Sequence, residues 1–229
     1  MGGINVKITM IERILRILAP HPCSGCGKLG TILCLDCKYN ITHEPFVGCI
    51  LCGKPENNGI CTSHNSPIER AFTVSSRTGA LEDAINRLKF HNTKAAAASL
   101  AELFHESLPS LPADIQLVPI PTVRSHIRQR GYDHVELIVS QFAALRHLPI
   151  ARPLLRKTRT TQHTVGKDAR RSQSAEAFGL NEDDSLLGTR VLLVDDIVTT
   201  GSTLVAAAQL LKNAGATVWV ATLAYQPLD

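Results

Sequence analysis

Several features are missing from this sequence of 229 residues, and each absence argues against a class of protein. No run of about 18 apolar residues occurs, so the sequence predicts no membrane-spanning helix. Glu12, Arg13 and Arg16 interrupt the apolar stretch near the N-terminus, which therefore does not read as a secretory signal. A large charge excess is also missing, because the net charge of +4 permits contact with polyanions without demanding it.

Cysteine is absent after Cys61, and all seven cysteines lie between Cys23 and Cys61. A secreted protein stabilised by disulfides would not normally confine its cysteines in this way, and an odd number leaves one thiol unpaired. Together with the missing export signal, this distribution predicts a cytoplasmic protein whose clustered thiols bind metal.

The cysteines form pairs with the spacing of zinc knuckles, in which two thiolates converge on one tetrahedral ion. Neighbouring pairs give two sets of four ligands: Cys23, Cys26, Cys34 and Cys37; and Cys49, Cys52, Cys61 and His64. Crossed pairing stays open, and His21 or His43 could replace His64. Gly27 and Gly53 allow the tight turn after a knuckle and favour two Zn²⁺ ions over an iron–sulfur cluster. Full four-ligand shells predict structural rather than catalytic metals.

Three regions are expected along the chain: an N-terminal helix (1–19), the metal-binding module (20–66) and an α/β domain (67–229). In the last region apolar strands alternate with amphipathic helices, which favours a mostly parallel sheet. Strands are expected at 71–75, 116–121, 190–194 and 217–224, and helices at 79–90, 94–108, 134–147 and 202–214. Residues 157–177 are polar and lack periodicity, which predicts a long surface loop.

The segment Val191–Thr203 (VLLVDDIVTTGST) has the most specific pattern in the sequence. An apolar strand ends in the adjacent carboxylates of Asp195 and Asp196. Small, hydroxyl-bearing or glycine residues then lead into a helix: Thr199, Thr200, Gly201, Ser202 and Thr203. Backbone N–H groups at a helix N-terminus bind phosphate, and carboxylates can accept hydrogen bonds from the hydroxyls of an attached sugar. The segment therefore predicts a ribose-phosphate site.

Two other interpretations of this segment are weaker. An acidic pair after an apolar strand is also typical of a Walker B element, but the sequence has no G-x4-GK[ST] loop to accompany it. The hydroxyl residues could serve only as helix caps, but capping does not account for the paired aspartates.

This segment resembles the phosphoribosyl-pyrophosphate (PRPP) signature of type I phosphoribosyltransferases. Other features make the chain similar to the competence protein F (ComF) family. The cysteine module precedes the domain, and VPIPTVRSHIRQRGYDHV (118–135) is similar to that family's V-P-x-P…R-x-R-G-[FY]-N-Q segment. Leu88-Lys89-Phe90 matches a recurring L-K-F. A family pattern R…Q…R…F is matched by Arg156, Gln162, Arg170 and Phe178. The resemblance covers nearly the whole chain after residue 20.

The resemblance implies a type I phosphoribosyltransferase fold, a mostly parallel sheet flanked by helices, behind an N-terminal double zinc ribbon. It implies that Asp195 and Asp196 hold the ribose hydroxyls of PRPP, that residues 199–203 hold its 5′-phosphate, and that residues 157–177 form a hood. Mg²⁺ would accompany PRPP, and Arg130 and Arg170 would join the two aspartates as catalytic groups. The residues expected around pyrophosphate are Lys89, Arg124, Arg130, Arg156, Gln162 and Arg170. Asp133-His134 replaces the family's Asn-Gln, which puts a carboxylate near that position.

Two classes of function are compatible with this sequence. The first is an enzyme that transfers phosphoribose from PRPP, with release of pyrophosphate, to an acceptor that the sequence does not identify. The second is a non-catalytic module that binds PRPP or single-stranded DNA, with DNA-uptake proteins as partners, as the family's name suggests. The basic segments 124–130 and 152–171 would suit DNA phosphates. The acidic pair favours the enzyme, because a DNA-binding surface gains nothing from it.

Overall fold

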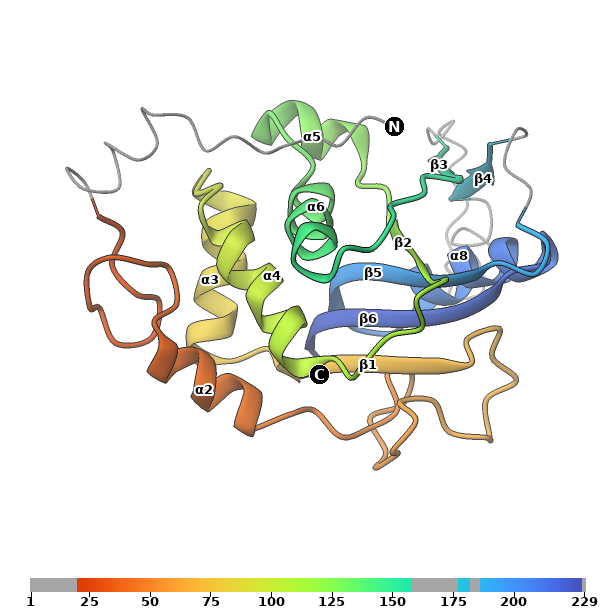
Figure 1. Cartoon of the computed structure of the whole chain (residues 1–229), viewed down its shortest axis with the longest axis horizontal. Helices are drawn as coiled ribbons and strands as arrows, with labels where there is room; N and C mark the ends of the chain where they lie inside the picture. Colours follow the sequence, from red (N-terminus) through yellow and green to blue (C-terminus); the bar gives the residue numbers. More distant parts are fainter. Residues whose placement is uncertain (1–19, 158–176, 182–185, 228–229) are drawn as a thin grey trace, which may run out of the picture.

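A computed structural model of the chain describes residues 20–157, 177–181 and 186–227 (Figure 1). The expected N-terminal helix and most of the expected loop, including Gln162 and Arg170, lie outside these residues. No helix within the described ranges is long and apolar enough to cross a membrane.

The domain is organised around a parallel sheet. Its strands are β1 (Arg70–Ser76), β2 (Gln116–Pro119), β5 (Arg190–Val198) and β6 (Thr217–Tyr225). They pair in the order β1-β6-β5-β2, and every pairing is parallel. A separate antiparallel pair consists of β3 (Leu154–Arg156) and β4 (Phe178–Leu180). The expected α/β fold with a parallel sheet is confirmed.

Helices cover both faces of the sheet, as Figure 1 shows. On one face, α3 (Gly79–Phe90), α4 (Ala96–Ser107) and α6 (His134–Arg146) pack with Leu192 and Val194. On the other, α8 (Ser202–Asn213) and the β3–β4 pair pack with Val191 and Leu193. Successive side chains of β5 enter opposite cores because strand residues alternate between faces.

Several element boundaries differ from the sequence prediction. β5 continues past Asp195 and Asp196 to Val198, because Ile197 and Val198 still pair with β6. The expected strand end at Val194 is therefore wrong, and both aspartates lie within the strand near its carboxyl end. Two short helices were not predicted: α2 (Leu35–His43), inside the cysteine region, and α5 (Arg124–Arg130), after β2.

Candidate functional site

A pocket of about 690 Å³ opens at the carboxyl ends of β2 and β5, where ligands commonly bind in open parallel sheets. Its wall comes from the end of α3, the segment after β2, α5, the start of α6, β3 and β5. The lining side chains that carry polar or charged groups are Lys89, Asn92, Thr122, His126, Gln129, Arg130, Tyr132, His134, Arg156, Asp195, Asp196 and Thr203. Topology thus gathers distant parts of the sequence around the predicted acidic pair.

The carboxylate of Asp196 is buried and held by two groups from other elements. Its Oδ2 lies 2.6 Å from the Lys89 Nζ and 3.1 Å from the His134 Nε2. Burial acts to raise the pKa of Asp196, but the Lys89 charge and the His134 hydrogen bond hold that pKa well below its usual range. Asp196 is therefore an anion with a fixed orientation, and its other oxygen can serve a ligand.

His134 connects Asp196 to Arg130. The Arg130 Nη1 lies 3.0 Å from the His134 Nδ1. Because a guanidinium only donates hydrogen bonds, Nδ1 must accept and the ring proton must sit on Nε2, facing Asp196. The tautomer assigned from this network makes His134 a neutral bridge, and it fixes the position of Arg130 at the pocket wall.

Asp195 has the opposite electrostatic environment to Asp196. Its side chain is partly buried, and Oδ1 accepts a hydrogen bond from the Asp196 backbone N–H at 2.9 Å. Burial, followed by the neighbouring Asp196 charge, raises the pKa of Asp195 to about 8. Without a bound cation, the pair therefore carries close to a single negative charge at neutral pH.

This raised pKa predicts a pH dependence of stability. The folded-state pKa of about 8 exceeds the ordinary aspartate pKa of about 3.9, so the folded state binds the extra proton between these values. The contribution of Asp195 to stability is complete below about pH 4 and is lost as the pH rises through about 8. Asp195→Asn should therefore have a larger free energy of unfolding than the wild type at pH 8, and a flatter profile from pH 5 to 8.

Urea unfolding without divalent cations or phosphate measures this difference. Asp114→Asn is the matched control, because Asp114 makes only an exposed ion pair with Arg190. An Asp195→Asn profile parallel to that of the wild type would contradict the assignment.

The predicted phosphate loop, residues 199–203, lies between β5 and α8. Gly201 is the N-cap of α8 with φ of +69°, a left-handed conformation that favours glycine. The Thr200 hydroxyl lies 3.1 Å from the Ser202 hydroxyl and 3.4 Å from the Ser202 backbone nitrogen, which donates to it. Thr203, in the first turn of α8, lines the pocket, and residues 199–202 lie directly before it in the chain. The start of α8 thus borders the acidic pair.

The other predicted site residues are distributed unevenly. Lys89, Arg130 and Arg156 line the pocket, and the Arg156 guanidinium lies 4.7 Å from the centre of the Phe178 ring. Arg124 begins α5 and is exposed, outside the residues that line the pocket.

Asp133 is used differently from the sequence expectation. Its side chain caps α6, accepting from the Val135 and Glu136 amides at 3.0 and 3.2 Å, and it also accepts from the Thr122 hydroxyl at 2.8 Å. It is not among the residues that line the pocket. The Asp133 carboxylate, which the sequence comparison placed near pyrophosphate, is thus held by the N-terminus of α6 and by Thr122.

Sequence reasoning also missed the role of His134. Nothing in the pattern of residues links it to Asp196, because the two are brought together only when α6 packs beside β5. The available signal was its position at the end of the connection that follows β2, because parallel sheets place functional groups after strand ends.

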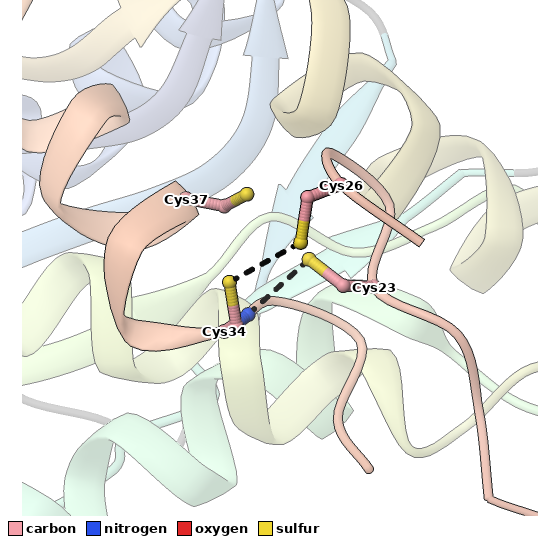
Figure 2. Close-up of side chains that lie close together, drawn as sticks. All are labelled: Cys23, Cys26, Cys34 and Cys37. Atoms are coloured by element: carbon pink, nitrogen blue, oxygen red, sulfur yellow. Dashed lines mark hydrogen bonds between the residues drawn. The ribbon is translucent and has the colours of Figure 1, made fainter. Parts of the chain in front are cut away.

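The first cluster consists of Cys23, Cys26, Cys34 and Cys37, whose sulfur atoms all lie within 4.8 Å of one another. Figure 2 shows these side chains pointing toward a common centre. The Cys26 and Cys34 sulfurs are 3.6 Å apart, close to the separation of about 3.8 Å that Zn–S bonds of about 2.3 Å give in a tetrahedron. Burial acts to raise the pKa of Cys23, but backbone N–H groups outweigh it and lower the pKa to about 6, which favours the thiolate.

The second cluster consists of Cys49, Cys52, Cys61 and His64, with the same convergence within 4.8 Å. Its Cys52 and Cys61 sulfurs are 3.7 Å apart. The His64 Nε2 is buried and has no hydrogen-bond partner among the described residues, as expected of a nitrogen that faces a metal. The structure therefore groups neighbouring pairs rather than crossed ones, and it places His64, rather than His21 or His43, in the second cluster.

Comparison with known proteins agrees with these features. A family model described as the phosphoribosyl transferase domain matches residues 136–228. The DNA utilization protein YhgH of Salmonella typhimurium is 31% identical, over 86% of this chain and 87% of its own length. The chain belongs to the ComF/YhgH family. The competence protein F of Haemophilus influenzae, a further relative, is 26% identical over 80% of this chain and 85% of its own length.

The residues matched by the family model contain one part of the site, and the rest of the site lies before them in the chain. The matched residues 136–228 contain β5, the predicted phosphate loop, α8 and β6. Lys89, Arg130 and His134 lie before them and reach the same pocket through the fold. A solved adenine phosphoribosyltransferase is similar over 63% of this chain and 75% of its own, with 15% identity and a TM-score of 0.38.

Proposed function

We propose that this protein binds PRPP and acts as a phosphoribosyltransferase of the ComF type, transferring phosphoribose to an acceptor with release of pyrophosphate. The observation that carries the proposal is the pair Asp195 and Asp196, at a strand end beside the glycine N-cap of α8 and inside a pocket lined by cations. This arrangement offers acceptors for a sugar and donors for phosphates within one site.

In this proposal each group has a distinct role. Lys89 and His134 both contact Oδ2 of Asp196, so Oδ1 is the atom that can accept from a ribose hydroxyl. The backbone N–H groups that open α8 suit the 5′-phosphate. Arg130 and Arg156 line the pocket and suit the pyrophosphate, whose negative charge grows as its bond to ribose C1 breaks.

Mg²⁺ is expected to accompany PRPP, because the ion prefers oxygen ligands and is held in such sites by one or two carboxylates plus substrate phosphates. The carboxylates of Asp195 and Asp196 fit that donor set. When bound, Mg²⁺ would neutralise charge on the pyrophosphate leaving group. Nearby positive charge would also favour the deprotonated form of Asp195, and so prepare it to accept from a ribose hydroxyl.

The test is PRPP binding, measured as thermal stabilisation in the presence of Mg²⁺. A ligand at about 100 times its dissociation constant adds about 2.7 kcal/mol to stability, which should raise the melting temperature measurably. Asp195→Ala combined with Asp196→Ala should abolish most of this stabilisation, because each unpaired buried partner costs about 1–3 kcal/mol. The double variant should still bind inorganic phosphate weakly, since the amides of α8 remain.

Asp114→Ala serves as the surface control for this experiment and should respond to PRPP as the wild type does. Release of pyrophosphate with candidate acceptors then separates catalysis from binding. A wild-type melting curve that millimolar PRPP does not move would reject the proposed function.

A second candidate is a non-catalytic module that binds single-stranded DNA. The observation in its favour is α5, a seven-residue helix with three arginines, no acidic residue and no buried residue. DNA binding that weakens steeply with salt, in a protein that does not bind PRPP, would favour this candidate. The relatives' names mention DNA utilization and competence, so a DNA-linked role is compatible with either candidate.

We also propose that each cysteine cluster holds one structural Zn²⁺. Purified protein should contain two zinc ions per chain by elemental analysis. Cys26→Ser should reduce this to one and should increase proteolysis of residues 20–43 more than of the sheet, because metal binding supplies the folding energy of such a segment. Ser24→Ala, in the same knuckle, is the control. One zinc ion or none in the wild type would contradict the two-site proposal.

A further inference from the structure

The two cysteine clusters pack against different parts of the domain. Cys23, Cys34 and Cys37 of the first cluster belong to the core beneath α3, α4 and α6. Ile50, in the knuckle between Cys49 and Cys52, belongs instead to the core beneath α8. Only the second cluster therefore packs beside the helix that begins at the phosphate loop.

The contact between the second cluster and the loop is direct. A Cβ atom at Gly201 would lie 2.3 Å from the Leu51 Cδ2 and 3.5 Å from the Ile50 carbonyl oxygen. Gly201 is buried under this side chain. Leu51 thus occupies the space beside the one position of the loop that has a left-handed backbone, and it limits where the loop can move.

Further contacts hold the segment around this knuckle against β6, the neighbour of the strand that leads into the loop. Phe46 stacks on Tyr225, with ring centroids 4.2 Å apart. A Cβ at Gly53 would lie 2.8 Å from the Tyr225 hydroxyl oxygen, so this turn also approaches closely. Tyr225 in turn pairs with Val198 at the end of β5. The knuckle is therefore braced against both β6 and the loop.

We propose that Leu51 is a positioning residue for the phosphate loop, and that metal at the second cluster keeps it in place. The proposal rests on the phosphate-binding function proposed above for residues 199–203. Metal bound to Cys49 and Cys52 would fix the two ends of the knuckle, and the knuckle would present Leu51 to Gly201. Loss of that metal would release the loop, whereas loss of metal from the first cluster would leave this contact intact.

The first experiment compares the clusters. Cys52→Ser and Cys26→Ser are each measured for zinc content and, by titration calorimetry, for affinity toward inorganic phosphate and toward PRPP with Mg²⁺. Cys52→Ser should weaken both affinities by about tenfold, which corresponds to about 1.4 kcal/mol, the size of one lost hydrogen bond to the phosphate. Cys26→Ser should weaken them far less. Equal losses in the two variants would overturn the proposal.

The second experiment leaves the metal ligands unchanged, so it does not depend on how well Cys52→Ser folds. Leu51→Ala should keep two zinc ions and lose affinity for phosphate, and Leu51→Met, which restores the bulk, should recover most of it. Leu29→Ala is the matched control, because Leu29 follows the knuckle of the first cluster and is 67% exposed. Unchanged phosphate affinity in Leu51→Ala would overturn the proposal. If the wild type binds neither ligand, the proposed function itself fails.

Discussion

Gly201→Val should abolish binding of both PRPP and inorganic phosphate. Two physical effects combine at this position. A φ of +69° is unfavourable for a non-glycine residue by about 1–2 kcal/mol, and more for a β-branched one. A Cβ would also lie 2.3 Å from the Leu51 Cδ2, far inside the normal carbon–carbon separation of about 3.5–4.0 Å. Either the Leu51 side chain or the loop must shift, and a shift of the loop moves the N–H groups at the start of α8 with it.

Gly188→Val is the control for this substitution. Gly188 has a φ of +70°, nearly the same as Gly201, but a Cβ there would meet nothing within 4 Å. The control therefore has the backbone strain without the collision, and it should keep its affinity for phosphate. Titration calorimetry on both variants, with circular dichroism to check folding, measures the difference. Phosphate binding by Gly201→Val at wild-type affinity would contradict the placement of the site.

Lys89→Met should destabilise the protein by about 3–5 kcal/mol, since removal of one partner leaves a buried charge without compensation. The side chains of Lys89 and Asp196 are only 16% and 5% exposed, and their charged atoms are 2.6 Å apart. His134 alone would then hold the anion. The pKa of Asp196, now held far below its usual range mainly by the Lys89 charge, should rise. Urea unfolding at pH 7 measures the loss.

Two comparisons separate this effect from simple loss of packing. The double variant Lys89→Met with Asp196→Asn removes both charges, and it should regain most of the stability. Asp114→Asn breaks the exposed pair with Arg190 and should cost less than about 1 kcal/mol. A Lys89→Met variant no less stable than Asp114→Asn would show that the pair is unimportant for folding.

Local patterns in the sequence were sufficient to predict the main elements of the domain. The helix 79–90 agrees with α3 at both ends, and the helix 134–147 agrees with α6 to within one residue. Apolar periodicity marked these helices because each packs a single face on the sheet. The strand end after Val194 was predicted wrongly, since pairing with β6 decides where β5 ends. The helix α5 lacks a buried face, so periodicity could not reveal it.

The candidate site was only partly predictable for the same reason. The acidic pair and the loop at 199–203 are adjacent in sequence, so their chemistry is visible in one segment. Lys89 and Arg130 were predicted as site residues only through the resemblance to the ComF family. Their contacts with Asp196 and His134 depend on helices packed beside β5. The capping role of Asp133 is local instead, because Asp133 directly precedes α6 and accepts from two of the free N–H groups in its first turn.

The sequence by itself determined which cysteines form knuckle pairs, because this spacing lets two thiolates converge on one ion whatever surrounds them. Tertiary structure decided that neighbouring pairs share a cluster and that His64 joins the second one. The sequence also determined the order of strand, acidic pair, glycine loop and helix, since these features follow one another along the chain. Tertiary structure decided which distant side chains meet them. His134 reaches Asp196 and Leu51 reaches Gly201 only because helices and knuckle close-pack against the sheet, and close packing between segments far apart in sequence leaves no local pattern.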